Sequence, residues 1–197
     1  MGNNIKTSYR WFILAASVLA MLFAGIIYAW SILKVPFAED FGWQAEQLSL
    51  NFTLTMCFFC IGGLLGSFLS RKIGVKLVGL ISAVLAGIGM AFTGFLDGNS
   101  VGMLYLTYAT MAGLGIGIAY NVIISTISAW FPDKKGFCTG CLMMGFGASS
   151  LILGNVADLL FKSSFDFRGT YIVLGISLFI VLGIVSFCLK RPDADIV

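Results

Sequence analysis

The segment Gly113–Gly140, GLGIGIAYNVIISTISAWFPDKKGFCTG, decides the fold class of this chain. An apolar run with closely spaced glycines leads into Trp130 and Phe131, and Pro132 then opens a short charged turn before a second apolar run. Such aromatic residues are typical of a membrane interface, and proline followed by charged residues is typical of a solvated turn. The segment therefore predicts a membrane crossing, a hairpin at the bilayer surface and the start of the next crossing.

The composition of the whole chain supports a membrane location. Hydrophobic residues make up 59% of the 197 positions and charged residues only 11%, whereas about a quarter of an ordinary soluble domain is charged. The net charge of +3 does not indicate a nucleic-acid partner, because the basic residues form short clusters between apolar runs and no single basic face. We expect an integral membrane protein whose surroundings are the lipid bilayer.

Six apolar runs approach or exceed the ~20 residues that a helix needs to cross a bilayer. They lie at about 12–33, 48–69, 75–96, 102–127, 137–158 and 169–189. The joints between them are too short for a soluble domain, so residues 1–197 are predicted to form a single all-α six-helix transmembrane bundle. The first run is longer than the apolar part of a secretory signal, and we interpret it as an uncleaved helix.

The positions of lysine and arginine predict the orientation of the bundle. Nine lie on the side of the N-terminus and three on the other side, and basic residues favour the cytosolic face. The nine are Lys6, Arg10, Arg71, Lys72, Lys76, Lys134, Lys135, Lys190 and Arg191, and the three are Lys34, Lys162 and Arg168. Both termini are therefore expected in the cytosol, in a multi-pass protein of the plasma or inner membrane.

A faint internal repeat relates the two halves of the chain. The segment Gly25–Tyr28 (GIIY) is echoed by Gly117–Tyr120 (GIAY), and Pro36 and Pro132 follow at nearly the same offset. Chance similarity among common membrane residues is one interpretation. The other is a three-plus-three inverted repeat, an arrangement that binds substrate near the bilayer midplane.

Several chemistries have no support in the sequence. No charged residue lies in the middle of a predicted helix, where proton relays usually have one. The chain has no histidine, so a Ser–His pair is impossible and an enzyme is not expected. The two CxxC pairs, Cys57/Cys60 and Cys138/Cys141, fall at different depths, which argues against a metal site or another bound cofactor.

The remaining candidates for a binding site are polar and aromatic residues, which offer donors beside apolar walls. The substrate-binding candidates are Tyr28, Trp30, Ser31, Tyr120 and Asn121, and Asn51, Thr53 and Thr55 are further cavity candidates. Each has an alternative role as an interhelical hydrogen bond or an interfacial anchor. Tyr28 and Tyr120 stand out, because the proposed repeat places them at equivalent depth facing a common cavity.

Two charged segments are candidate gating elements. They contain Arg71, Lys72, Gly74 and Lys76 in the joint between the second and third helices, and Asp133, Lys134 and Lys135 in the hairpin. For the basic joint, the alternative is a topology signal that needs only the positive charge.

Three stretches resemble a known family. They are Gly25–Ser31 (GIIYAWS), Trp130–Gly136 (WFPDKKG) and Met144–Gly147 (MGFG). They resemble the oxalate/formate antiporter branch of the major facilitator superfamily, and the likeness covers essentially the whole chain but only the first six of the twelve helices in that fold. The resemblance implies alternating-access transport of small carboxylates such as oxalate, formate or lactate, with Tyr28 and Tyr120 in the cavity. It also implies that basic substrate-binding groups belong to a second six-helix bundle.

One joint departs from the superfamily pattern Gly-x-x-x-Asp-Arg-x-Gly-Arg-Lys. With the pattern anchored on Gly74, Ser67 replaces the leading glycine and Arg71 replaces the aspartate. The resemblance therefore does not extend to a gating salt bridge that depends on that aspartate.

The sequence favours one half of a secondary transporter for small-molecule carboxylates, acting with a second six-helix half or as a homodimer. A truncated fragment that does not transport and a membrane adaptor or scaffold are the alternatives.

Overall fold

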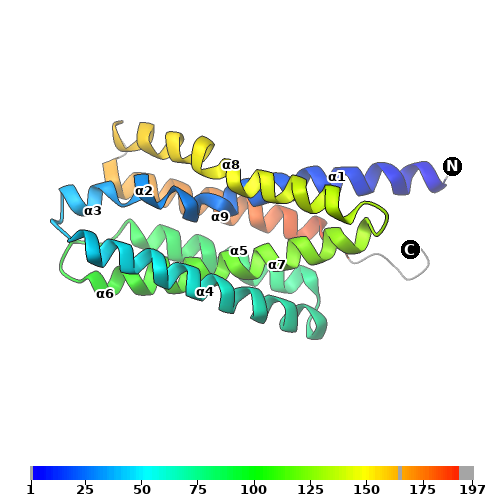
Figure 1. The fold of residues 1–197 in the computed structure, drawn as a ribbon, viewed down its shortest axis with the longest axis horizontal. Helices are drawn as coiled ribbons and strands as arrows, with labels where there is room; N and C mark the ends of the chain where they lie inside the picture. The colour runs from blue at the N-terminus through cyan, green and yellow to red at the C-terminus, as the bar shows by residue number, and fades with distance from the viewer. Residues whose placement is uncertain (1, 164–165, 191–197) are drawn as a thin grey trace.

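The computed structural model describes residues 2–163 and 166–190, which form six helical spans arranged side by side (Figure 1). The first span contains α1 (Gly2–Ala24), η1 (Gly25–Ala29), α2 (Trp30–Leu33) and α3 (Val35–Glu39), and the fourth contains α6 (Val101–Leu104), η2 (Tyr105–Ala112) and α7 (Gly113–Trp130). The others are single helices, α4 (Ala45–Lys72), α5 (Val75–Thr93), α8 (Lys135–Phe161) and α9 (Asp166–Cys188). The predicted all-α six-helix bundle is confirmed.

The first span is longer than predicted, because helical turns continue past the end of the apolar run. The Lys34 N–H donates to Trp30 O at 2.9 Å, and α3 follows to Glu39. Pro36 lies in the first turn of α3, where a missing N–H costs no hydrogen bond. Lys34 thus lies inside a helical span, which corrects its predicted place in a joint.

The other boundaries differ from the apolar runs by a few residues for local reasons. The α4 helix begins at Ala45, where the Gln44 N–H donates to Gln47 Oε1 at 3.0 Å. The tight turn into α5 depends on Gly74, whose φ of +89° is a conformation that favours glycine. The α5 helix ends at Thr93, three residues before the predicted end.

The helices pack in the pairs that a three-plus-three repeat requires. Helix α4 packs on α7, joining the second and fourth spans, and α8 packs on α1 and η1, joining the fifth and first. An inverted repeat exchanges these two pairs, and the α5–α9 pair of the third and sixth spans maps onto itself.

Two glycines from the repeated sequence occupy equivalent contacts in these pairs. A Cβ atom on Gly25 would overlap the carbonyl oxygen of Phe146 on α8. A Cβ atom on Gly117 would overlap the carbonyl oxygen of Phe59 on α4. The two GIxY segments therefore share one packing role, which favours a repeat over chance similarity.

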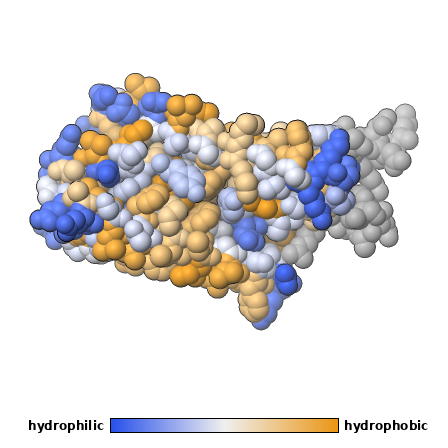
Figure 2. All heavy atoms as spheres, in the orientation of Figure 1, coloured by the Kyte–Doolittle hydropathy of each residue, from blue (hydrophilic) through white to orange (hydrophobic). Residues whose placement is uncertain are grey.

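The surface of the bundle suits a bilayer. Hydrophilic residues gather at the two ends of the long axis, with mainly apolar residues between them (Figure 2). Large apolar side chains point outward in that band, including Leu64 and Leu151, which are 74% and 71% exposed. Such a surface is a liability in water but is solvated by lipid tails. The chain is therefore a multi-pass membrane protein.

The start of α1 and the end of α9 lie at one end of the bundle, which we call the termini end, and α3 and α6 lie at the opposite, loop end (Figure 1). Long-range hydrogen bonds hold the loop end together. Trp43 Nε1 donates to Gly98 O at 3.2 Å, and the Tyr171 hydroxyl donates to Leu33 O at 2.7 Å. Of the nine basic residues assigned to the cytosolic side, Arg191 lies outside the described residues.

The charge bias gives a testable orientation. On a cysteine-free background, a cysteine at Asn99 at the loop end should react with impermeant reagent only from outside the cell. A cysteine at Lys134, at the termini end, should react only from inside, because basic residues favour the cytosolic face. The reverse pattern of labelling would contradict the assignment of both termini to the cytosol.

Candidate functional site

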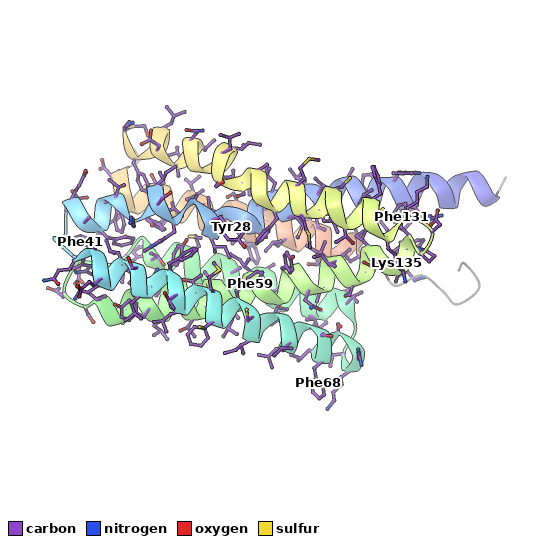
Figure 3. The ribbon with its side chains drawn as sticks, in the orientation of Figure 1. Tyr28, Phe41, Phe59, Phe68, Phe131 and Lys135 are labelled. Atoms are coloured by element: carbon purple, nitrogen blue, oxygen red, sulfur yellow. The ribbon has the colours of Figure 1, made fainter. Side chains whose placement is uncertain are left out.

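Four aromatic side chains from four spans meet in a recess near the middle of the bundle, where Figure 3 places Tyr28 and Phe59. We call it the central recess; its volume is ≈ 250 Å³, and it is lined by Tyr28, Phe59, Tyr120, Met143, Phe146 and Gly147. The Phe146 ring centre lies 5.2 Å from that of Tyr28 and 5.1 Å from that of Tyr120. The structure thus brings the two tyrosines selected from the sequence to one recess.

The aromatic contacts repeat across the two halves. Tyr28 packs edge-on against Phe146, and Tyr120 packs edge-on against Phe59, with ring centres 5.1 Å apart in the second pair. Each phenylalanine is also the residue whose carbonyl faces Gly25 or Gly117. One glycine and one tyrosine, three residues apart, therefore make matching contacts in both halves.

The tyrosine hydroxyls are available to a ligand. Tyr28 is 45% exposed, Tyr120 is partly buried, and neither hydroxyl forms a hydrogen bond with another residue of the described chain. A phenol O–H is a neutral donor, and the aromatic rings around the two hydroxyls form apolar walls beside them. The recess therefore offers two donors and apolar walls.

A second recess of ≈ 410 Å³ lies between the first span and α4, towards the loop end, and Tyr28 borders both recesses. We call it the loop-end recess, and its lining is Tyr28, Trp30, Ser31, Lys34, Ser49, Phe52 and Thr53. Of the residues predicted to line a cavity, Ser31 and Thr53, which are both exposed, belong to this recess. Trp30 borders it but is 95% buried, because its Nε1 donates to Leu48 O at 2.9 Å and its ring packs on Tyr108. Trp30 therefore has a packing role.

The structure places three further candidates outside the recesses. Asn121 does not line the central recess, and its amide nitrogen points towards Gly63 of α4. Asn51 is fully buried, and its side chain has no hydrogen-bond partner among the described residues. The Thr55 hydroxyl donates to Asn51 O at 2.7 Å within α4, which is a local role.

Sequence reasoning missed the two central phenylalanines and Lys34. Phe146 stands in the MGFG stretch, but no sequence signal distinguishes it or Phe59 from the other phenylalanines among the 18 in the chain. Lys34 was missed because the apolar run stops at Leu33, although the helix continues.

The hairpin at the termini end is tied to the first helix by what we call the hairpin clasp. Arg10 Nη2 lies 2.7 Å from Asp133 Oδ1, and its guanidinium lies 4.5 Å from the centre of the Phe131 ring. Lys134 Nζ lies 5.5 Å from the centre of the Trp11 ring. The hydrogen bond from Arg10 holds the pKa of the Asp133 carboxyl below its ordinary value.

The other predicted gating segment lies apart from this clasp. Arg71, Lys72, Gly74 and Lys76 are all exposed, and Lys72 Nζ lies 4.4 Å from the centre of the Phe68 ring. In Figure 3 Phe68 is well separated from Phe131 and from Lys135, the first residue of α8. The structure does not bring the two gating segments together within this bundle.

The lowered pKa predicts how the clasp responds to acid. A carboxyl with a depressed pKa contributes stability above its ordinary pKa, and this contribution is lost as the pH falls through the lowered value. Asp133→Asn should therefore lower the Tm at pH 7, and only slightly, because the pair is solvent-exposed. The difference in Tm between the variant and the unsubstituted protein should become smaller below about pH 4. The unpaired, exposed Asp40→Asn is the control. A Tm difference that stays the same from pH 7 to acidic pH would contradict this role of the pair.

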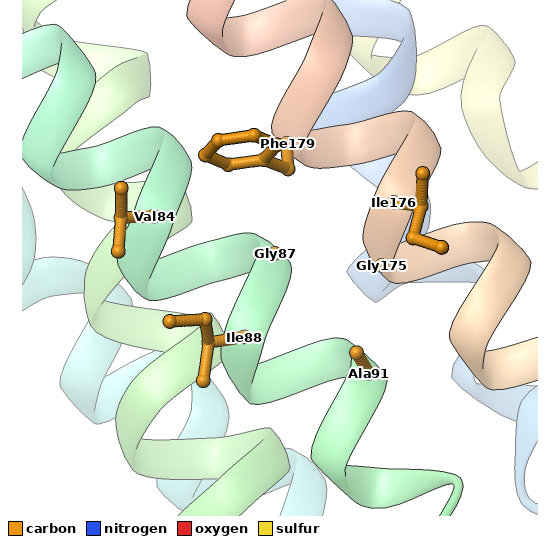
Figure 4. Close-up of a pocket in the computed structure, with 7 residues that line it drawn as sticks. All are labelled: Val84, Gly87, Ile88, Ala91, Gly175, Ile176 and Phe179. Carbon is orange, nitrogen blue, oxygen red and sulfur yellow. The ribbon is translucent and has the colours of Figure 1, made fainter.

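A groove between α5 and α9 (Figure 4) is unsuited to an anion. It has a volume of ≈ 370 Å³, and its lining is Val84, Gly87, Ile88, Ala91, Gly175, Ile176 and Phe179. None of these side chains can donate a hydrogen bond. Ile176 and Phe179 are about half exposed on the outside of the bundle, so the groove belongs to the lipid-facing surface.

Six apolar spans related by an internal repeat, with a recess where the halves meet, define a transporter-type membrane bundle. The chain belongs to the Major Facilitator Superfamily, whose family model matches residues 11–197.

Known relatives agree with this assignment. The chain is 29% identical over 182 residues to the oxalate:formate antiporter of Oxalobacter formigenes. The aligned residues make up 90% of this chain and 43% of the antiporter. It is 27% identical over 142 residues to the uncharacterized MFS-type transporter YhjX of Escherichia coli, and the aligned residues make up 72% of this chain and 35% of YhjX. It is 31% identical over 139 residues to human monocarboxylate transporter 12, and the aligned residues make up 71% of this chain and 26% of that transporter. The chain therefore spans less than half the length of these relatives.

Proposed function

We propose that this chain forms one wall of a pathway that transports small carboxylates by alternating access. The observation that carries the proposal is the central recess, where Tyr28 and Tyr120 present two unpartnered hydroxyls from repeat-related positions. The names of the antiporter and the monocarboxylate transporter support an organic anion as the substrate. The plasma or inner membrane is the proposed location.

A second six-helix unit would supply the facing wall, either as a separate chain or as a second copy of this one. The lining of the central recess contains no lysine or arginine. A carboxylate removed from water needs a compensating charge or several strong donors, and two phenols supply only part of that requirement. A separate second chain would supply the missing cation, whereas a second copy of this chain would supply two further tyrosine hydroxyls from its own recess. A non-transporting fragment and a membrane scaffold are the outcomes that a failed transport assay would favour.

The gating proposal divides the two charged segments. The clasp of Arg10 with Asp133 joins elements of the same bundle, so it moves with the bundle as one body. Arg71, Lys72 and Lys76 are exposed and form no ion pair with a described residue, so they are free to meet the second unit. These three basic residues are the proposed gating contacts at the termini end.

Removing either hydroxyl tests the site. In the complete transporter, Tyr28→Phe or Tyr120→Phe should weaken carboxylate binding by about 0.5–1.5 kcal/mol, the net value of one hydrogen bond. This corresponds to a roughly two- to twelvefold increase in Kd, with expression unchanged. Tyr9→Phe is the control, because the Tyr9 hydroxyl donates to Cys188 O near the termini end. Unchanged binding in both variants would assign the tyrosines to packing.

A further inference from the structure

We propose that Lys34 and the hydroxyls around it form a second carboxylate site, a capture site at the loop-end mouth of the pathway. Lys34 is the one cation in the lining of the loop-end recess, and it shares that recess with Ser31, Ser49 and Thr53. The site takes small mono- and dicarboxylates, and its physiological role rests on the carboxylate transport proposed above.

The ammonium group of Lys34 is not committed to the protein. The described residues contain two ion pairs, Arg10–Asp133 and Lys162–Asp158, and Lys34 belongs to neither. The acidic residues closest in sequence, Glu39 and Asp40, line a different recess on the α8 and α9 side, where they share it with Lys162. The Lys34 charge is therefore available to an anion.

The neighbouring hydroxyls complete a donor set. Tyr28, Ser31 and Lys34 recur every three residues on the first span, and Ser49, Phe52 and Thr53 face them at helical spacing on α4. The side chains of Ser31 and Ser49 form no hydrogen bond with another described residue. A carboxylate beside Lys34 can accept one charge-assisted bond from the ammonium and neutral bonds from these two hydroxyls.

The loop-end recess and the central recess are neighbours, because Tyr28 lines both. Six residues separate Tyr28 from Lys34, a rise of about 9 Å along the helix. An anion held by Lys34 is thus within a short step of the Tyr28 hydroxyl. Lys34 and Tyr28 therefore place two donors in succession from the loop end towards the centre of the bundle.

Acylation of Lys34 provides a direct test on the chain itself. The purified protein in a neutral maltoside detergent is treated with an amine acylating reagent, with or without oxalate, at ionic strength matched with chloride. Mass spectrometry then gives the acylation rate of each lysine. We expect oxalate to slow acylation of Lys34, and to leave Lys76 at the termini end and Lys162 at the loop end unchanged. Equal rates at Lys34 with and without oxalate would overturn the proposal.

A lipid phosphate is the other source of an anion at this depth, since a lysine near a helix end can reach the headgroups. A second arm therefore adds phosphatidylglycerol. Protection by oxalate that persists with the lipid present supports a carboxylate site. Protection by the lipid alone, with no effect of oxalate, would contradict the proposal and assign Lys34 to the membrane surface.

A transport arm separates this proposal from the proposed function. In the transporter completed by its second unit, Lys34→Gln should raise the KM for external oxalate about tenfold, the value of a charge-assisted bond, and Lys34→Arg should restore most of it. Lys162→Gln removes the same charge at the same end and should change KM less than about twofold. Absence of exchange in the unsubstituted protein would refute carboxylate transport, with the acylation result still deciding the site. Exchange with unchanged KM in Lys34→Gln would refute the capture site alone.

Discussion

Liposomes that contain this chain as a monomer should show no saturable carboxylate exchange. The central recess has two neutral donors and no cation in its lining, and Tyr28 and Met143 lie about half exposed on its open side. A carboxylate there lacks both the compensating charge and the facing wall that excludes water. Counter-loaded vesicles with labelled oxalate, formate and lactate provide the measurement.

When a second six-helix unit is added to the same liposomes, clear carboxylate exchange should appear. The control is the same second unit reconstituted without this chain, which should also be inactive. Robust saturable exchange by a demonstrated monomer of this chain would contradict the two-unit account. Exchange by a demonstrated dimer of this chain would identify the second unit as another copy.

Alanine at Gly117 should strongly reduce the amount of folded protein. The added Cβ would overlap the Phe59 carbonyl oxygen, and backbone cannot move aside without separating α7 from α4. Overpacking of this kind costs about 1–3 kcal/mol, a large part of the stability of a typical domain. The measurement is the Tm of the purified protein together with its yield of monodisperse material.

The repeat predicts the same loss for Gly25→Ala, which meets the Phe146 carbonyl oxygen on α8. The matched control is Gly147→Ala, because a Cβ there has no neighbour within 4 Å. A control as unstable as the two variants would show that alanine in these helices is harmful for another reason. Normal stability of both variants would contradict the packing role of the repeated glycines.

The sequence was sufficient for the architecture because hydropathy and length determine where a chain can cross a bilayer. The hairpin around Pro132 and the repeated GIxY segments appear in the structure as a turn and as two equivalent helix contacts. Helix ends were less predictable, because hydrogen bonds carry a helix beyond its apolar residues. The first span illustrates this, since it includes Lys34 and continues to Glu39.

The candidate site was predictable only in part. The repeat selected Tyr28 and Tyr120, but sequence spacing contains no information on which phenylalanines from α4 and α8 meet them. Trp30 and Asn121 had the right chemistry at a plausible depth, yet the rotation of each helix turns them towards a neighbouring helix. The Arg10–Asp133 pair joins residues that are 123 positions apart, and no local sequence pattern predicts such a contact.

The most direct test of the central claim, that the tyrosine recess forms a wall of the carboxylate site, is substrate protection at Gly147. The complete transporter, with the five native cysteines replaced, would carry Gly147→Cys in the recess or Gly136→Cys in the first turn of α8, both positions with open space around Cβ. The account predicts that oxalate slows thiol modification at position 147, with a half-effect concentration close to the KM for exchange, and leaves position 136 unchanged. Modification at position 147 that is equally fast with and without saturating oxalate would contradict it.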